Sequence, residues 1–249
     1  MALSNRYSDY DSFAWVYNKH WGNQFTPIAL SVLEKFALPF IQPNANILDL
    51  CCGTGQLAQI LTERCYRVTG LDGSKEMLRF AHKNAPDTKF IMDDARTFKL
   101  PAIYNLVISM FDSLNHIMTY EELTAVFLNA HVALQEGGLF LFDLNLEHGY
   151  KVNWDGSHGI AEDDYVCVFQ TNYSPEEHTA RLDVTIFRLE DNWRRSDFTL
   201  IQRCYSKSEV QSALETAGFV DISAYVYDRQ LGWIDLTKES DRAFFLCRK

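Results

Sequence analysis

Short apolar runs alternate with segments of helical spacing along residues 46–145. Each apolar run is short enough for a buried strand, and each intervening segment repeats its apolar residues every three or four positions. The predicted strands are 46–51, 67–72, 88–94, 104–111 and 138–145. The predicted helices between them are 56–64, 74–85 and 120–135. Apolar strands separated by such helices predict a parallel sheet covered on both faces.

The residues before this region are rich in aromatic side chains at helical spacing. Residues 10–21 place Tyr10, Phe13 and Tyr17 on one face of a predicted helix. Packing is the simplest role for such a face. A second helix is predicted over 27–38, with Pro27 at its start. We therefore expect a helical N-terminal cap over residues 1–40.

The pattern changes again after the fifth predicted strand. Residues 147–163 are polar and predict a loop. Strand-like runs follow at 164–173, 179–190 and 193–205, joined by turn-rich segments. They predict an antiparallel insert, which would hang over the carboxyl ends of the parallel strands. The α/β pattern then resumes with a helix at 207–217 and strands at 220–229 and 242–248.

Composition narrows the functional classes. The 249 residues are 47% hydrophobic, which is ample for a sizeable core. The formal net charge of −10 disfavours a nucleic-acid partner, because such a surface repels phosphate backbones. The six cysteines show no C-x-x-C or metal-ligand spacing, which favours reduced thiols in a cytoplasmic protein. The N-terminus does not resemble a signal peptide, and no apolar run predicts a membrane span.

The segment NILDLCCGTGQLAQIL, residues 46–61, carries the main chemical signal. Gly53 and Gly55 lie between a predicted strand and a helix, where an open α/β sheet binds its ligand. Asp49, Asp72 and Asp94 each stand at or just before the end of one of three consecutive strands. Because the carboxyl ends of parallel strands share one sheet edge, these acids are expected to face a common crevice. An acid after the second strand can accept hydrogen bonds from both ribose hydroxyls.

The glycines alone leave the ligand open. Gly53-x-Gly55-x-x-Ala58 also fits the dinucleotide fingerprint, and Asp72 falls near the expected distance. NAD and a monomeric adenosine ligand cannot be separated on this pattern. A nicotinamide-dependent oxidoreductase is therefore one alternative. A non-catalytic partner protein that keeps the fold is another.

Other segments add to this pattern, and together they resemble the class I S-adenosylmethionine-dependent methyltransferases. ILDLCCGTGQLA is similar to the first motif of that family, VTGLDGSKEML to its acidic second-strand motif, and FIMDDARTF to its adenine-side motif. LQEGGLFLFDLN resembles the loop leading into the fifth strand. The resemblance implies a Rossmann-like α/β fold, with a seven-stranded, mostly parallel sheet and an antiparallel last strand. It assigns residues 1–146 and 206–249 to the cofactor-binding domain, and residues 147–205 to an inserted β lid.

The resemblance also implies roles for individual residues. Asp49 and the backbone of Gly53–Gly55 would hold the methionine end of the cofactor, and Asp72 the ribose. Asp94 would accept from the adenine amino group. Residues at the end of the fourth strand would flank the cofactor, and Tyr17 would cover it. The full implied cofactor-binding set is Asp49, Gly53, Gly55, Asp72, Gly73, Met77, Asp94, Ala95, Met110, Phe111 and Tyr17.

Two positions depart from the family pattern. Cys51 stands where the family usually has its first glycine, which suggests an altered turn. Asn105 stands where an aspartate commonly begins the fourth strand, so a functional role for residue 105 is doubtful. Neither departure removes an implied cofactor contact.

Methyl transfer from a sulfonium is an in-line displacement, and placement in a dry pocket can supply much of its acceleration. A general base is therefore optional, and His116, just after the fourth strand, is the catalytic candidate. His148, Tyr150 and Trp154 could line the acceptor pocket, whereas a structural ion pair is favoured for Arg203. The expected acceptor is a small molecule, with an amine as one option. The insert could also form a homodimer contact, since strand edges need pairing or protection.

Overall fold

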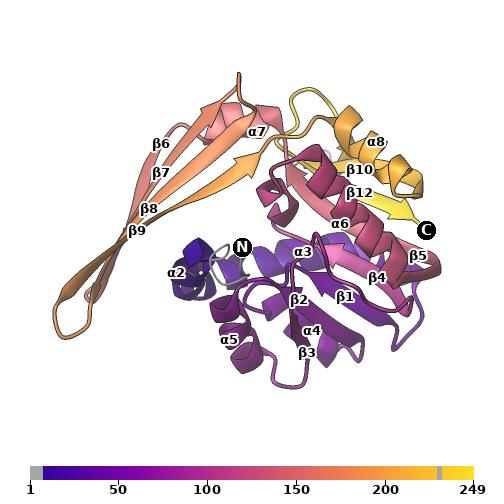
Figure 1. The fold of residues 1–249 in the computed structure, drawn as a ribbon, viewed down its shortest axis with the longest axis horizontal. Helices are drawn as coiled ribbons and strands as arrows, with labels where there is room; N and C mark the ends of the chain where they lie inside the picture. Colours follow the sequence, from indigo (N-terminus) through magenta and orange to yellow (C-terminus); the bar gives the residue numbers. More distant parts are fainter. Residues whose placement is uncertain (1–7, 229–231) are drawn as a thin grey trace.

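The computed structural model describes residues 8–228 and 232–249, which form two β-sheets with helices around the larger one (Figure 1). The larger sheet has eight strands in the order β11-β10-β12-β5-β4-β1-β2-β3. Its strands are β1 (Asn46–Leu50), β2 (Arg67–Asp72), β3 (Lys89–Met92), β4 (Tyr104–Ser109), β5 (Leu134–Asn145), β10 (Val220–Asp228), β11 (Gly232–Asp235) and β12 (Arg242–Arg248).

The pairing confirms the predicted Rossmann-like class. Strands β1 to β5 pair in parallel, whereas β12 runs antiparallel to both β5 and β10. The short edge strand β11 is an addition to the predicted seven strands, and it pairs antiparallel with β10. The predicted strand 220–229 matches β10, with Arg229 outside the described residues. Residues 1–7 of the predicted cap also lie outside them.

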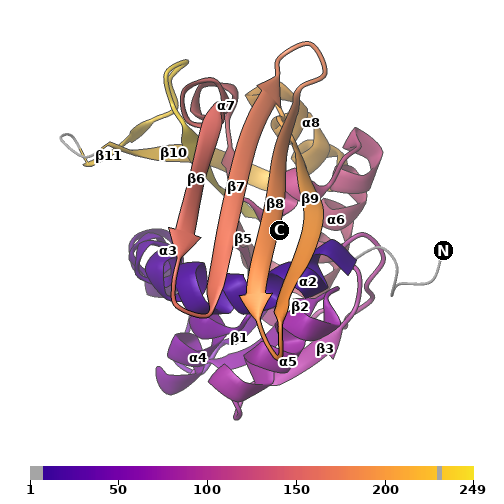
Figure 2. The same cartoon turned by 90° about the vertical axis from the view of Figure 1, so that its left-hand side faces the viewer.

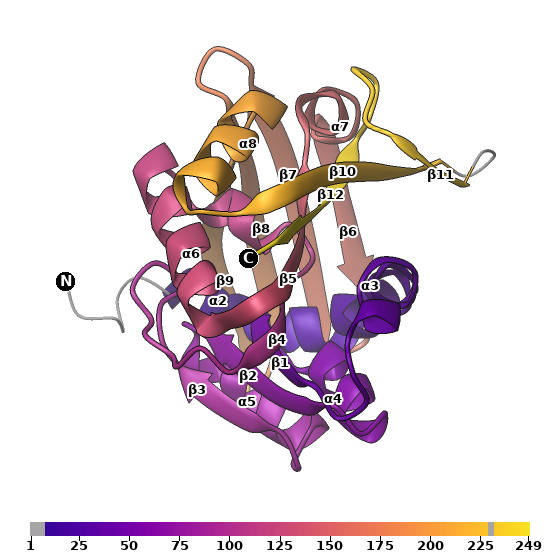
Figure 3. The same cartoon turned by 90° about the vertical axis from the view of Figure 1, so that its right-hand side faces the viewer.

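Helices cover both faces of the larger sheet (Figure 3). Helices α3 (Gly22–Phe36) and α4 (Gln56–Glu63) pack on one face, and α6 (Tyr120–Ala133) and α8 (Lys207–Thr216) on the other. Helix α5 (Lys75–Asn84) follows β2. Two separate hydrophobic clusters fill the two layers, so the sheet is buried on both sides, as the continuous apolar strands predict.

The N-terminal segment is helical, as predicted, but its boundaries differ. Helix α2 (Ser8–Val16) continues into a π-helical turn, η1 (Tyr17–Trp21), and α3 then begins at Gly22. Pro27, predicted to start the second helix, instead lies inside α3. A proline removes one helical hydrogen bond, here to the carbonyl of Asn23, and Asn23 is exposed to water. Solvent can therefore satisfy the freed carbonyl.

The predicted antiparallel insert is a four-stranded sheet, seen face-on in Figure 2. Its strands are β6 (Gly156–Ala161), β7 (Tyr165–Ser174), β8 (Thr179–Leu189) and β9 (Trp193–Arg203). The loop prediction for 147–163 is wrong, because helix α7 (Glu147–Asn153) and strand β6 occupy that range. Strand β6 lies at the sheet edge and is nearly all exposed. It is therefore stabilised by its backbone pairing with β7 and not by burial of apolar side chains.

The inner face of the smaller sheet packs against the N-terminal helix. Tyr165, Phe169 and Phe198 join Phe13 and Met77 in one hydrophobic cluster. The cluster brings α2, the start of α5 and the smaller sheet together beside the carboxyl ends of the parallel strands. In the described ranges, 8–228 and 232–249, no helix is both long and apolar enough to cross a membrane.

Candidate active site

The loop between β1 and α4 forms a tight turn tied to β2. The backbone N–H of Gly53 donates to Asp72 Oδ2 at 2.9 Å, and that of Cys52 donates to the Leu71 carbonyl at 3.0 Å. Gly55 has φ +81°, and a Cβ there would lie 2.9 Å from the Ala81 Cα, so α4 can begin close to α5 only with glycine at this position.

The two departures from the family pattern have structural explanations. Cys51 adopts φ +61°, a left-handed conformation that favours glycine, so the cysteine occupies the turn at a cost in backbone strain. The turn itself is formed. Asn105 Oδ1 accepts from the Asn46 backbone N–H at 2.9 Å, joining the start of β4 to the start of β1. Asn105 lines neither of the cavities described below.

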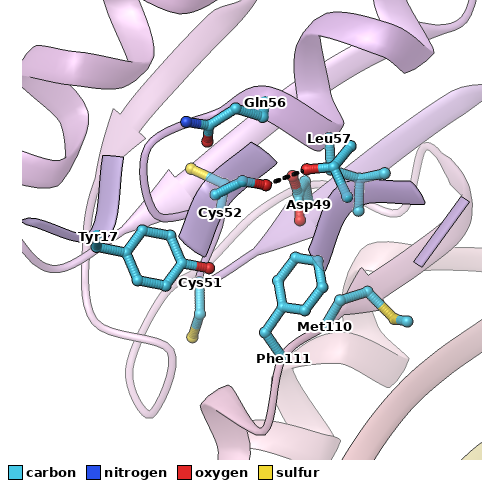
Figure 4. A pocket seen from close by; sticks show the side chains of 10 residues that line it. Tyr17, Asp49, Cys51, Cys52, Gln56, Leu57, Met110 and Phe111 are labelled. Carbon is cyan, nitrogen blue, oxygen red and sulfur yellow. Dashed lines mark hydrogen bonds between the residues drawn. The ribbon is translucent and has the colours of Figure 1, made fainter. Parts of the chain in front are cut away.

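Asp49 is a buried carboxylate without a full set of partners. Its side chain is 3% exposed, and Oδ2 has no hydrogen-bond partner among the described residues. Burial, and then the charge of Asp72, raises the pKa of Asp49 to about 8. Figure 4 shows Tyr17 and Phe111 beside it, in the wall of a cavity of about 20 Å³. An unpaired buried carboxylate is stabilised by a cation, so this position fits a positively charged group.

Asp72, at the end of β2, is held by backbone donors. Its Oδ1 accepts from the Ser74 N–H at 2.8 Å, and its Oδ2 from Gly53. Burial raises the pKa of Asp72 to about 6, and these two hydrogen bonds oppose the rise. Each carboxylate oxygen has two lone pairs, so each can still accept one ribose hydroxyl.

The carboxylate of Asp94, just after β3, pairs with an arginine two residues further on. It accepts from Arg96 Nε at 2.8 Å and from Arg96 Nη2 at 2.6 Å. These two charge-assisted hydrogen bonds orient Asp94 toward Arg96. The neighbouring residues Asp93 and Ala95 line the larger cavity, and Asp94 does not. A contact between Asp94 and adenine stays a prediction.

A cavity of about 550 Å³ extends from the glycine turn to the inner face of the smaller sheet. Its volume is within the usual range for a small-molecule site. Of the predicted residues, those lining it are Tyr17, Gly53, Asp72, Gly73, Met77, Ala95, Phe111 and His116. Asp49 and Met110 line the smaller cavity, whose wall shares Tyr17, Cys51 and Phe111 with the larger one. Gly55 and Asp94 line neither cavity.

Tyr17 lies between these two cavities. It comes from the π-helical turn, and its ring lies 3.6 Å from the position that a Cβ on Gly53 would take. Burial, with the nearby carboxylates of Asp112 and Asp49, raises the pKa of Tyr17. The phenol is therefore a neutral hydroxyl over the glycine turn, where the resemblance places a cover for the cofactor.

His116 is held on both ring nitrogens. Its Nδ1 lies 2.9 Å from the Ile201 carbonyl, which can only accept, so Nδ1 carries the proton. Its Nε2 then accepts from the Gln202 side-chain amide at 3.0 Å. Burial lowers the pKa of His116, which keeps the ring neutral. His116 lines the larger cavity, but its basic nitrogen is already engaged.

The other candidates have mainly structural contacts. Arg203 Nη2 pairs with Glu209 at 3.0 Å, which agrees with the structural ion pair favoured from the sequence. His148 pairs with Asp241 at 2.7 Å, and the buried Tyr150 donates to Gln202 at 2.7 Å. Trp154 lines the larger cavity.

Sequence reasoning missed a polar network in the wall of the larger cavity. It joins Asp112, Asp143, Gln202 and Arg242, which come from four separate parts of the chain. Asp112 directly follows Phe111 after a predicted strand, so the rule that found the other acids could have found it. The remaining members meet only through long-range folding, and no local pattern marks them.

Comparisons with known proteins agree with the motifs and the fold. Residues 47–138 match the family model described as a methyltransferase domain. One relative is YqeM of Bacillus subtilis (strain 168), which is named as a methyltransferase. It is 27% identical over 253 residues, and the alignment covers 96% of this chain and 97% of YqeM. The dTDP-3-amino-3,6-dideoxy-alpha-D-glucopyranose N,N-dimethyltransferase of Streptomyces fradiae is 36% identical over 147 residues, covering 56% of this chain and 55% of that protein.

A solved structure shares the whole architecture. SAM-bound CalS10, described as an amino pentose methyltransferase from Micromonospora echinaspora, aligns with a TM-score of 0.69 at 20% identity. The alignment covers 94% of each chain, and at this identity it shows a common fold.

The domain match assigns residues 47–138 to a methyltransferase domain, and the whole chain shares the fold of CalS10. CalS10 is described with S-adenosylmethionine bound. The residues present fit that cofactor, because the unpaired Oδ2 of Asp49 suits a cation and the bare turn at Gly53 opens on the cavity. The comparisons do not favour the oxidoreductase or the non-catalytic alternative.

Proposed function

We propose that the enzyme methylates an amine on a small molecule. One observation carries this proposal: the cavity of about 550 Å³ continues past the cofactor residues into a chamber walled by the smaller sheet. Phe169, Leu182 and Leu200 form its apolar wall, and Asp112 and Gln202 its polar wall. The relatives named above as acting on amino sugars support an amine-bearing acceptor of this size.

The chain's own groups account for binding and placement. The bound cofactor supplies an electrophilic methyl group on a sulfonium. Asp49 provides the anion for the positively charged methionine end, and Asp72 accepts from the ribose hydroxyls. Met77 and Ala95 line the region expected for adenine. Tyr17 and Phe111 line both cavities. Because the sulfonium already activates the methyl group, the main catalytic task of the chain is to hold the acceptor nitrogen in line and dry.

We also propose that residues 147–205 act as a lid subdomain on the cofactor-binding domain of 1–146 and 206–249. The inner face of β7 to β9 packs on α2 and walls the chamber, so movement of this sheet would open a path for the acceptor. Water would be excluded when the sheet is closed. The role of His116 as a general base stays a prediction from the sequence.

The proposal is tested by binding and then by turnover. Calorimetric titration with S-adenosylmethionine should give micromolar binding and a raised melting temperature. A panel of amines with matched alcohols and carboxylic acids should then show methylation of amines. Methylation confined to alcohols or acids would refute the amine, and failure to bind the cofactor would contradict the cofactor-site assignment.

Two finer assignments belong with this proposal. The described cysteines are free thiols, which supports a cytoplasmic location. Strand β6 is an open edge of the smaller sheet, which supports a homodimer through the insert. Light scattering behind size-exclusion chromatography tests the dimer. A protein that elutes with the 28.7 kDa mass of one chain at working concentrations would rule it out.

A further inference from the structure

Two carboxylates share one guanidinium at the acceptor end of the cavity. Arg242, on β12, donates through Nη2 to Asp112 Oδ1 at 2.6 Å and through Nη1 to Asp143 Oδ2. The group of three has two negative charges and one positive charge, so one negative charge is in excess. A cavity wall of this kind attracts a cation and repels an anionic acceptor group.

The excess charge belongs to Asp112 rather than to Asp143. Asp143, on β5, is fully buried, and it also accepts from the backbone N–H groups of Phe111 at 2.6 Å and Asp112 at 3.0 Å. The chain therefore satisfies Asp143 internally. Asp112 lines the cavity, and its side chain is 19% exposed. It is the member of the pair that a ligand can reach.

Gln202 fixes the orientation of Asp112. From β9 it donates to Asp112 Oδ2 at 2.5 Å, and its carbonyl oxygen accepts from the Tyr150 hydroxyl at 2.7 Å. Each oxygen of Asp112 thus has one donor from the chain and one lone pair left. The carboxylate cannot rotate without losing a charge-assisted hydrogen bond, so its remaining acceptor positions are preorganised.

Backbone geometry places this carboxylate next to the transfer site. Phe111 and Asp112 have φ values of +66° and +49°, and this pair of left-handed residues turns the chain sharply after β4. The turn puts Phe111 between the two cavities and Asp112 in the wall beyond it. Strain of this kind at consecutive non-glycine residues is characteristic of functional sites.

We propose that Asp112 is the residue that binds the amino group of the acceptor and takes its proton. The ammonium N–H donates to a free position on the Asp112 carboxylate, the N–H bond breaks, and an O–H bond forms on that oxygen. The ammonium becomes a neutral amine, the carboxylate a carboxylic acid, and the nitrogen keeps the electron pair that it needs as a nucleophile. His116 is less suited to this step, because Gln202 already occupies its basic nitrogen.

This inference rests on the proposed amine acceptor, and a binding experiment separates the two. Wild-type protein saturated with S-adenosylhomocysteine is titrated by calorimetry with pairs of ligands that differ only in an amino or a hydroxyl group, such as glucosamine and glucose. The wild type should bind the amine more tightly by about 10- to 100-fold, the range for one charge-assisted hydrogen bond. In Asp112→Asn this preference should fall to about 3-fold or less, within the range of an ordinary hydrogen bond.

The variant is chosen to preserve the fold. Asparagine has the same shape and tolerates the left-handed backbone at position 112. Unchanged affinity for S-adenosylhomocysteine shows that the cofactor site is intact. If Asp112→Asn does not fold, the same titration is made with Asp112→Ser. The preference of the wild type for the amine over its matched alcohol also still tests the proposal. Asp241→Asn is the matched control, because it removes an acid from the same cavity wall, one that is bonded to His148.

The outcomes are distinct. Loss of the preference in Asp112→Asn, with its retention in Asp241→Asn, supports the assignment. An equal preference in wild type and Asp112→Asn overturns the role of Asp112 and leaves the amine acceptor standing. A wild type that binds S-adenosylhomocysteine but prefers no amine to its matched alcohol overturns both proposals.

Discussion

Cofactor binding at neutral pH should release nearly one proton from Asp49. The pKa of Asp49 is raised to about 8, so at pH 7 this group is about 90% protonated before binding. A bound cation favours the ionised carboxylate, and the proton must then leave. Asp72, with a pKa of about 6, is about 10% protonated at pH 7 and adds little. The expected release is therefore about 0.9 proton, and it should vanish near pH 10.

Calorimetry measures this release directly. The binding enthalpy of S-adenosylmethionine is recorded at pH 7 in phosphate and in Tris, and the slope against buffer ionisation enthalpy gives the number of protons. Asp49→Asn should remove the slope and weaken binding by about 10- to 100-fold, because its side chain has no charge. Adenosine is the control ligand, since it lacks the cationic methionine end and should release no proton from Asp49.

Two results would refute this reasoning. A slope near zero for the wild type would mean that Asp49 is already ionised, or that it stays protonated when the cofactor is bound. A slope that persists in Asp49→Asn would assign the proton to another group. Either result would remove the predicted coupling between cofactor binding and ionisation of Asp49.

Three further predictions follow from the same contacts. First, the free energy of unfolding without cofactor should fall as the pH rises from about 4 to about 8. The raised pKa of Asp49 is the reason, because in this range the folded protein keeps a proton that the unfolded chain has lost. Melting curves should show this fall in the wild type, and a pH dependence that persists undiminished in Asp49→Asn would count against it. Second, Asp72→Ala should weaken S-adenosylmethionine binding by about 10-fold or more, because two ribose hydrogen bonds are lost. The control variant Asp93→Asn should weaken binding less. Equal effects of the two variants would contradict the ribose role of Asp72. Third, Gly55→Ala should lower the melting temperature more than Gly137→Ala. Both glycines have positive φ, but only at position 55 would the new Cβ lie 2.9 Å from Ala81. Equal losses would mean that backbone strain alone decides the effect.

The main sheet and the cofactor end of the site were largely predictable from local patterns. Buried parallel strands must be apolar throughout, and the helices between them must be amphipathic, so the period of the pattern changes at every boundary. The bare turn at Gly53 and the acid at Asp72 follow from the same order of strand, turn and helix. These features depend on neighbours in the chain, and the structure places both residues on the cavity.

The errors arose where neighbours in space decide the structure. Strand β6 has little apolar character and is held by its pairing with β7. Helix α7 begins where the Leu146 N–H donates to the carbonyl of Asp241, far away along the chain. The hydrogen bond from Arg96 to Asp94 is a further contact that motif order does not reveal, while the predicted contact between Asp94 and adenine stays a prediction.

The sequence by itself determined the class of fold, the succession of strands and helices along the chain, and the glycine turn at which a nucleoside cofactor is expected. Only the tertiary structure decided what surrounds the methyl acceptor. Arg242 and Asp112 lie 130 positions apart and Gln202 and Asp112 lie 90 apart, yet they form one network at the cavity wall. Periodicity reports which face of an element is buried, whereas a polar network depends on which buried faces meet, and that is settled only when the whole chain has folded.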